Sequence, residues 1–113
     1  MTSYMGRPKQ GQVFLMAVSF RDQPGKNKVR PVIVVSNERA TDIDVVAVSV
    51  TSRPPRSEFD VIIEAWREAG LSKPSIARTS KLFSVSIDQL QSSLGQLQSI
   101  DLQRILQKCR DIF

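Results

Sequence analysis

The chain has 113 residues, a formal net charge of +5 and an isoelectric point near 9.9. It contains no histidine and a single cysteine, Cys109, which excludes a structural zinc site, a catalytic triad, a His–Cys pair and a disulfide within one chain. The excess of cations favours an anionic partner, with nucleic acid as the first candidate.

The composition is that of a soluble globular protein, with 41% hydrophobic and 24% charged residues. The apolar runs are shorter than the roughly 18 residues that cross a bilayer, and the first residues lack the layout of a signal peptide. We therefore expect a cytoplasmic protein in which residues 1–113 form a single domain, with 1–11 as a loose N-terminal segment.

Short apolar runs rich in strand-forming residues occupy most of the chain. They predict strands at residues 12–20, 31–36, 43–50, 59–63, 75–79 and 82–87. Two short helical segments are expected at 64–69 and 88–94, ended by Gly70 and Gly95.

The last segment has the clearest helical pattern. Ser99 suits an N-cap, and apolar residues recur behind it at helical spacing, at Leu102, Ile105, Leu106, Cys109 and Ile112. Closely spaced strands with one terminal helix predict a mainly β fold, either a small antiparallel barrel or a curled sheet.

The strongest electrostatic feature is the segment 21–30, which we interpret as a loop. It carries four cations against one anion, Asp22. A solvated hairpin loop that is kept from aggregating by its charge would explain this pattern. Phosphate binding would explain it equally well, because Arg30 adjoins a stiff apolar strand that would hold its planar guanidinium in place.

Two further segments combine hydroxyls and cations. Thr51, Ser52 and Arg53 follow the third predicted strand, where functional loops often lie, although a hydroxyl-rich turn before two prolines explains them too. Segment 78–81 (Arg-Thr-Ser-Lys) alternates cations and hydroxyls, which fits either a phosphate-binding strand or a charged edge strand.

Other residues favour structural interpretations. Asp42 and Asp44 could chelate Mg²⁺, but no third carboxylate lies near them in the sequence, which favours a polar segment before a strand. Trp66 is interpreted as a packing residue. Cys109 falls on the apolar stripe of the terminal helix and is interpreted as a core residue.

Six segments, in order, resemble the MazF/PemK family, the mRNA-cleaving toxins of bacterial type II toxin–antitoxin pairs. They are 11–14 (Gly-Gln-Val-Phe), 30–37 (Arg-Pro-Val-Ile-Val-Val-Ser-Asn), 48–52 (Val-Ser-Val-Thr-Ser), 69–75 (Ala-Gly-Leu-Ser-Lys-Pro-Ser), 77–82 (Ala-Arg-Thr-Ser-Lys-Leu) and 94–97 (Leu-Gly-Gln-Leu). The resemblance implies a small SH3-like antiparallel β-barrel with a C-terminal helix, acting as a homodimer.

The same resemblance implies a reaction, the cleavage of single-stranded RNA at short sequences without a metal or other cofactor. The ribose 2′-OH attacks its own phosphate and leaves 2′,3′-cyclic phosphate and 5′-OH ends. It also implies a cognate antitoxin whose disordered tail folds over the cleft.

The resemblance assigns catalytic roles to three residues. Arg30 is similar to the catalytic arginine of the second strand, Thr51 to the threonine that hydrogen-bonds the reacting phosphate, and Arg78 to an arginine that acts on the scissile phosphate. Substrate-binding residues are expected around them, at Lys26, Lys28, Ser52, Arg53, Ser80 and Lys81.

One position departs from the family pattern. Ser80 stands where the PemK branch has its proposed general base, an aspartate, and the histidine of that branch's first loop is absent. Arginine is a poor base because it stays protonated in proteins. The base would then be Asp22, another loop carboxylate or a water.

Two alternative functions remain open on the sequence alone. A protein of the same fold could bind nucleic acid without cleaving it, or poison DNA gyrase as the related CcdB-type toxins do, because fold alone does not fix function. A structural barrel whose charge serves solubility is the other alternative.

Overall fold

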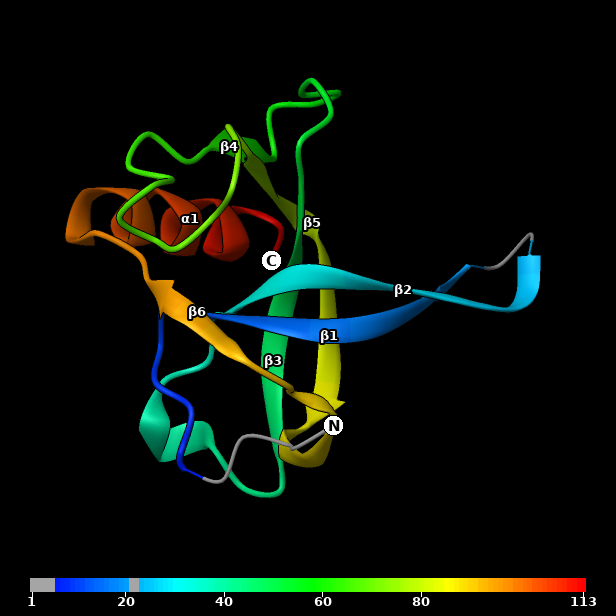
Figure 1. Ribbon diagram of the computed structural model, residues 1–113. Helices are drawn as coiled ribbons and strands as arrows, with labels where there is room; N and C mark the ends of the chain where they lie inside the picture. The colour runs from blue at the N-terminus through cyan, green and yellow to red at the C-terminus, as the bar shows by residue number, and fades with distance from the viewer. Residues whose placement is uncertain (1–5, 21–22) are drawn as a thin grey trace.

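A computed structural model describes residues 6–20 and 23–113. It consists of a strongly curled six-stranded sheet with a single α-helix packed against it (Figure 1). The strand order is β4-β5-β3-β2-β1-β6, and every neighbouring pair is antiparallel. The expected fold class, a mainly β fold with a small antiparallel barrel or curled sheet and a C-terminal helix, is confirmed, and the sheet curls into a half-barrel. The elements are β1 (Gln12–Phe20), β2 (Gln23–Val34), η1 (Glu38–Ala40), β3 (Asp44–Thr51), β4 (Asp60–Ile62), β5 (Ile76–Ser86), η2 (Ile87–Gln89), β6 (Ser93–Gln96) and α1 (Ser99–Asp111).

The β1–β2 hairpin projects from the rest of the sheet (Figure 1). The prediction of a loop over 21–30 was wrong for 23–30, which continue β2. Their backbone pairs with β1, as Val18 does with Lys28 and Ser19 with Asn27. A two-stranded ribbon beyond the core has no face that must be apolar, so a polar, charged sequence can still form strands there.

The strand β5 is continuous where two short strands, 75–79 and 82–87, were expected. Its pairing with β3 shifts between two neighbouring residues, so that Val48 faces Leu82 while Ser49 faces Arg78. The bulge accommodates the polar residues that interrupt the apolar pattern, so β5 continues through this segment as one strand.

The prediction of a helix over 88–94 was also wrong. Only the short 3-10 turn η2 and the strand β6 occupy this region, and Gly95 pairs with Val13 of β1. Gly95 therefore does not end a helix. It allows close approach, because a Cβ at this position would lie 2.6 Å from the Ala69 carbonyl oxygen.

Residues 64–70 form turns instead of the expected helical segment. Their last residue, Gly70, has φ of +85°, a conformation that side chains disfavour. Trp66 packs partly buried against the core, as expected. The carboxylate of Asp101 accepts hydrogen bonds from the backbone N–H groups of Glu64 and Ala65, and so ties this segment to α1.

The helix α1 begins one residue earlier than its expected cap implies. Gln98 occupies the N-cap position and Ser99 is the first helical residue. The predicted stripe faces the sheet, with Ile105, Leu106 and Cys109 buried.

Alternate residues of the strands fill two separate apolar clusters. Val13 and Ile33 belong to the cluster that α1 covers, whereas Phe14 and Val32 belong to the other. The curled sheet thus buries side chains on both faces, because successive residues of a strand point to opposite sides. In the described parts of the chain, no helix has the length and apolar character required to span a membrane.

The described part of the N-terminal segment is tied to the sheet. The backbone N–H of Gly11 donates to the carbonyl oxygen of Val34 at 2.7 Å. The side-chain amide of Gln10 donates to the carbonyl oxygen of Val35 at 2.9 Å.

Candidate active site

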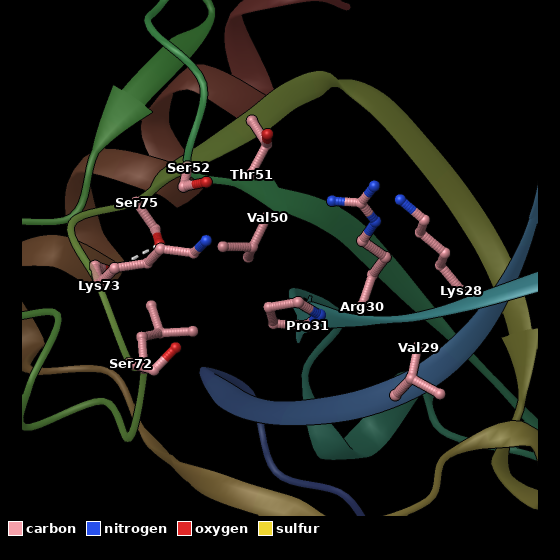
Figure 2. A pocket seen from close by; sticks show the side chains of 11 residues that line it. Lys28, Val29, Arg30, Pro31, Val50, Thr51, Ser52, Ser72, Lys73 and Ser75 are labelled. Atoms are coloured by element: carbon pink, nitrogen blue, oxygen red, sulfur yellow. Dashed lines mark hydrogen bonds between the residues drawn. The ribbon is translucent and has the colours of Figure 1, made fainter.

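Two cavities adjoin at the base of the β1–β2 hairpin. The first, of about 280 Å³, is lined by residues of β2, the end of β3 and the segment before β5 (Figure 2). The second, of about 260 Å³, is lined by Arg30, Ser49, Val50, Thr51, Arg53, Arg56 and Arg78. The two share Arg30, Val50 and Thr51.

All three residues predicted to be catalytic line the second cavity. Arg30 lies on β2, Thr51 ends β3 and Arg78 lies on β5, and these are three neighbouring strands. Arg78 pairs directly with Ser49 in the sheet. The register in which Val32 faces Ser49 places Arg30, inside β2, beside Thr51 at the end of β3, since each lies two residues from that pair.

The other predicted binding residues divide between the cavities and their surroundings. Lys28 and Ser52 line the first cavity and Arg53 lines the second, whereas Ser80 and Lys81 are exposed and line neither. The side chain of Lys26 and the whole of Asp22, one candidate for the general base, lie outside what the structure describes.

The structure adds residues that the sequence did not single out. Arg56 joins the second cavity, and Ser72, Lys73 and Ser75 line the first. The last three fall within segment 69–75 of the family resemblance, which was the available signal. Arg56 lies in a proline-rich connection for which the sequence gives no position relative to the strands.

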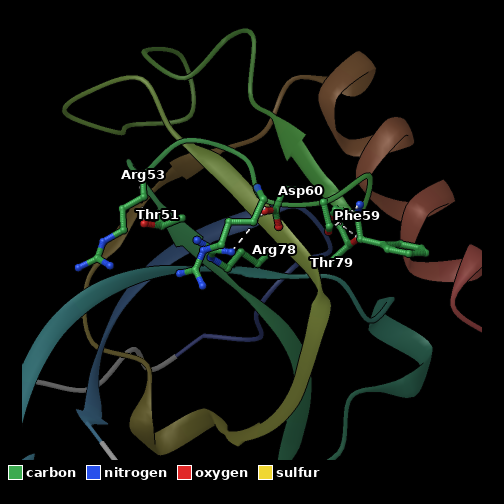
Figure 3. A network of polar contacts seen from close by, with 8 residues as sticks. Thr51, Arg53, Phe59, Asp60, Arg78 and Thr79 are labelled. Atoms are coloured by element: carbon green, nitrogen blue, oxygen red, sulfur yellow. Dashed lines mark hydrogen bonds and ion pairs between the residues drawn. The ribbon is translucent and has the colours of Figure 1, made fainter. Parts of the chain in front are cut away.

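Asp60 is a further residue that the sequence analysis missed. Its Oδ2 lies 3.3 Å from Nη1 of Arg78 and accepts a hydrogen bond of 2.8 Å from the backbone N–H of Arg56 (Figure 3). The side chain of Asp60 is 2% exposed and that of Arg78 is 15% exposed. The only sequence signal is one carboxylate inside an apolar run, between Phe59 and Val61.

The hydroxyl of Thr51 is oriented by its own loop. Its Oγ1 accepts a hydrogen bond of 3.2 Å from the backbone N–H of Arg53. Because a hydroxyl can accept and donate at once, this bond leaves its proton available for a phosphate oxygen.

The charge around the two cavities is strongly positive. Four arginines line the second and two lysines line the first, and no carboxylate appears in the lining of either among the described residues. Guanidinium groups match the geometry of phosphate oxygens, so this arrangement is suited to hold a phosphodiester.

Three residues that had been interpreted as structural line neither of these cavities. Asp42 and Asp44 are exposed at the start of β3, and no group of three or more acidic or cysteine side chains in residues 6–20 and 23–113 is arranged to hold a metal ion. Cys109 is buried under the sheet, and this burial raises the pKa of its thiol, an effect that nearby Arg110 partly opposes.

Comparison with protein families gives a match over residues 9–113, to the PemK-like, MazF-like toxins of type II toxin–antitoxin systems. The chain belongs to the PemK/MazF family. Comparison with curated proteins gives no significant match.

Solved structures share the PemK/MazF fold at low sequence identity. MazF in a MazE–MazF crystal structure from Deinococcus radiodurans has a TM-score of 0.77 and 18% identity, with 96% of each chain covered. An endoribonuclease from a mycobacterial species has a TM-score of 0.74 and 19% identity, covering 96% of this chain and 92% of its own. A mycobacterial endoribonuclease in complex with its cognate antitoxin has a TM-score of 0.69 and 23% identity, with 92% of each chain covered.

Proposed function

We propose that this PemK/MazF chain is an endoribonuclease toxin that cleaves single-stranded RNA in the second cavity. The observation that carries the proposal is that Arg30, Thr51 and Arg78, from three neighbouring strands, line one cationic cavity. Structural neighbours named as endoribonucleases support it.

The proposed reaction needs no redox partner and no covalent enzyme intermediate. The ribose 2′-OH loses its proton, its oxygen bonds to phosphorus, and the bond from phosphorus to the 5′-oxygen breaks as that oxygen gains a proton. The products are a 2′,3′-cyclic phosphate and a 5′-OH. Charge accumulates on the phosphate oxygens in the transition state, so preorganised cations lower the barrier without a metal.

Each residue has a distinct part in this proposal. Arg30, on the wall between the cavities, neutralises the non-bridging oxygens, and Thr51 donates its hydroxyl proton to one of them. Arg78 stabilises the departing 5′-oxygen. Arg53 and Arg56 bind a neighbouring phosphate, and the first cavity, with Lys28, receives the adjoining nucleotide.

The proton acceptor is assigned to Asp22 or a water molecule. Ser80, at the family position of the base, lies away from both cavities, and a serine hydroxyl is not a base at neutral pH. Asp22 stands between β1 and β2 in the sequence, outside the described residues, and is proposed for its carboxylate alone.

The decisive experiment uses the purified protein and a single-stranded RNA of mixed sequence in excess EDTA. We expect fragments that end in 2′,3′-cyclic phosphate and whose 5′-OH ends accept phosphate from polynucleotide kinase. The Arg30→Ala/Arg78→Ala variant, purified identically, controls for contaminating ribonuclease. Intact RNA that is nevertheless bound would contradict cleavage and support a non-cleaving nucleic-acid-binding toxin instead.

We also propose that the protein acts in the cytoplasm as a homodimer and is neutralised by a cognate antitoxin. The antitoxin-bound neighbours support the last point. An acidic antitoxin tail lying over the cationic cavities would block RNA by competing for the same arginines. Light scattering after gel filtration tests the dimer. The proposal also predicts a small antitoxin reading frame beside the gene, and co-expression with it tests neutralisation.

A further inference from the structure

The buried carboxylate of Asp60 lies directly behind the second cavity. It faces Arg78 across the β4–β5 pair, in which the two residues are register partners. It contacts the Arg78 guanidinium at 3.3 Å and the Arg56 backbone N–H at 2.8 Å. One side chain thus contacts two of the arginine residues that form the cavity.

The exposure of Asp60 argues against its being the proton acceptor. With 2% of its side chain exposed, it cannot meet a ribose hydroxyl unless the strand pair moves. Its partner Arg78 is also mostly enclosed, yet it lines the cavity. The carboxylate therefore acts on the substrate indirectly, and Arg78 is the residue whose cationic group it contacts.

A fixed arginine is a better electrostatic catalyst than a mobile one. A free arginine side chain has several rotatable bonds, and ordering it on the substrate costs conformational entropy. A charge-assisted bond to Nη1 supplies that order beforehand, and the guanidinium has five donors, so it can contact Asp60 and a phosphate together.

We propose that Asp60 is a positioning residue that holds Arg78 in the orientation required for phosphodiester cleavage. This inference rests on the proposed endoribonuclease function. It predicts that removal of the Asp60 charge lowers kcat and leaves KM nearly unchanged, since Arg30, Arg53 and Arg56 still bind the RNA.

The chain contains a matched control in Asp101. Its side chain is also 2% exposed, lies 3.3 Å from an arginine, Arg104, and accepts backbone N–H groups. That ion pair is on α1, and neither partner lines the two cavities. A purely structural effect of losing a buried carboxylate would thus appear equally in Asp101→Asn.

The experiment measures kcat and KM for RNA cleavage by the wild type, Asp60→Asn, Asp101→Asn, Arg78→Ala and the Asp60→Asn/Arg78→Ala double variant, each shown to be folded at the assay temperature by circular dichroism. The amide of Asp60→Asn can still accept the Arg56 N–H, so this change removes chiefly the charge. If Asp60→Asn does not fold, Asp60→Glu replaces it, since the longer side chain keeps the charge but displaces it by one methylene.

We expect Asp60→Asn to lower kcat about tenfold or more, Asp101→Asn to change it less than about twofold, and Asp60→Asn to have little further effect once Arg78 is alanine. Asp60→Glu is expected to lower kcat severalfold. Wild-type kcat in the folded Asp60 variant, or equal and independent losses in the presence and absence of Arg78, would overturn the positioning role. RNA left intact by the wild type would instead overturn the proposed function.

Discussion

Arg30 and Thr51 lie on the wall that the two cavities share, one from β2 and the other from the end of β3. A phosphate held between them would place the nucleotides on its two sides in different cavities. The antiparallel register brings a cation from inside β2 and a hydroxyl from the end of β3 together, with little freedom to move.

Replacement of either arginine is expected to impair catalysis. Arg30→Ala and Arg78→Ala should each lower RNA cleavage at least about tenfold, because each removes a cation from the charge that develops on the phosphate. Arg30→Ala should remain folded, as Arg30 lies outside the apolar clusters, whereas Arg78→Ala leaves the buried Asp60 carboxylate without its cation, so its fold is checked by circular dichroism before the assay. Single-turnover rates with one labelled RNA measure the effect, and full activity in both variants would remove these residues from the mechanism.

The hydroxyl of Thr51 is expected to matter more than its methyl group. Thr51→Val keeps the shape but loses both the bond to the Arg53 N–H and the proton offered to phosphate, and should lower kcat about tenfold. Thr51→Ser keeps the hydroxyl and should stay within a few-fold of the wild type. The same cleavage assay decides, and equal rates for the valine and serine variants would contradict the assigned role.

Arg53 and Arg56 are expected to contribute to affinity through phosphate charge. Each of Arg53→Ala and Arg56→Ala should weaken RNA binding and make its dependence on salt less steep, by about 0.7 in the slope of log K against log salt for each phosphate that the protein no longer neutralises. Arg39→Ala, at an exposed residue of η1, serves as the control. Fluorescence anisotropy across a salt series gives the slopes, and unchanged slopes would place the RNA elsewhere.

The sequence predicted the elements whose apolar pattern is set by local burial. The strand Gln12–Phe20 and the buried stripe of α1 follow directly from such patterns. Prediction failed where tertiary contacts override the local signal. Gly95 was interpreted as a helix stop, but it lies in the strand β6. A glycine is needed there because the Ala69 carbonyl oxygen lies 2.6 Å from where a Cβ would be, a tertiary contact that no local pattern reveals.

The residues of the candidate site also differ in whether the sequence could predict them. Arg30, Thr51 and Arg78 could be named because the family resemblance supplied them. Asp60 could not, because its contact with Arg78 depends on the register of β4 against β5, and β5 in turn carries a bulge against β3. No spacing in the sequence encodes that register, and a lone acidic residue in an apolar strand has no motif.

The backbones at Gly70 and Gly95 lie so close together that a side chain at either position is expected to destabilise the fold. Gly70 has φ of +85°, and a Cβ added there would collide with the Leu94 carbonyl group. Gly70→Ala should therefore lower the free energy of unfolding by about 3 kcal/mol or more, from combined backbone strain and displacement of β6. Urea denaturation measures it.

The control for this change is Ser99→Ala, because Ser99 is an exposed first residue of α1 and not its cap. This variant should stay within about 0.5 kcal/mol of the wild type, as surface substitutions without special contacts do. A loss near 1 kcal/mol would restore Ser99 as the helix cap, and a stable Gly70→Ala would show that β6 can move aside.

Cys109 is expected to be unreactive in the native protein. Burial raises the pKa of its thiol, so at a given pH the folded chain holds less thiolate than the unfolded chain, and thiolate is the reactive form. Alkylation by iodoacetamide should be slow at pH 8, rise only at more alkaline pH, and become fast in urea. Because the pKa of the thiol is higher in the folded than in the unfolded chain, the free energy of unfolding falls as pH rises through the ordinary cysteine range, where the unfolded state releases its proton first. Cys109→Ala should lack this part of the pH dependence. Equally rapid labelling of folded and unfolded protein at pH 8 would contradict the core position of the thiol.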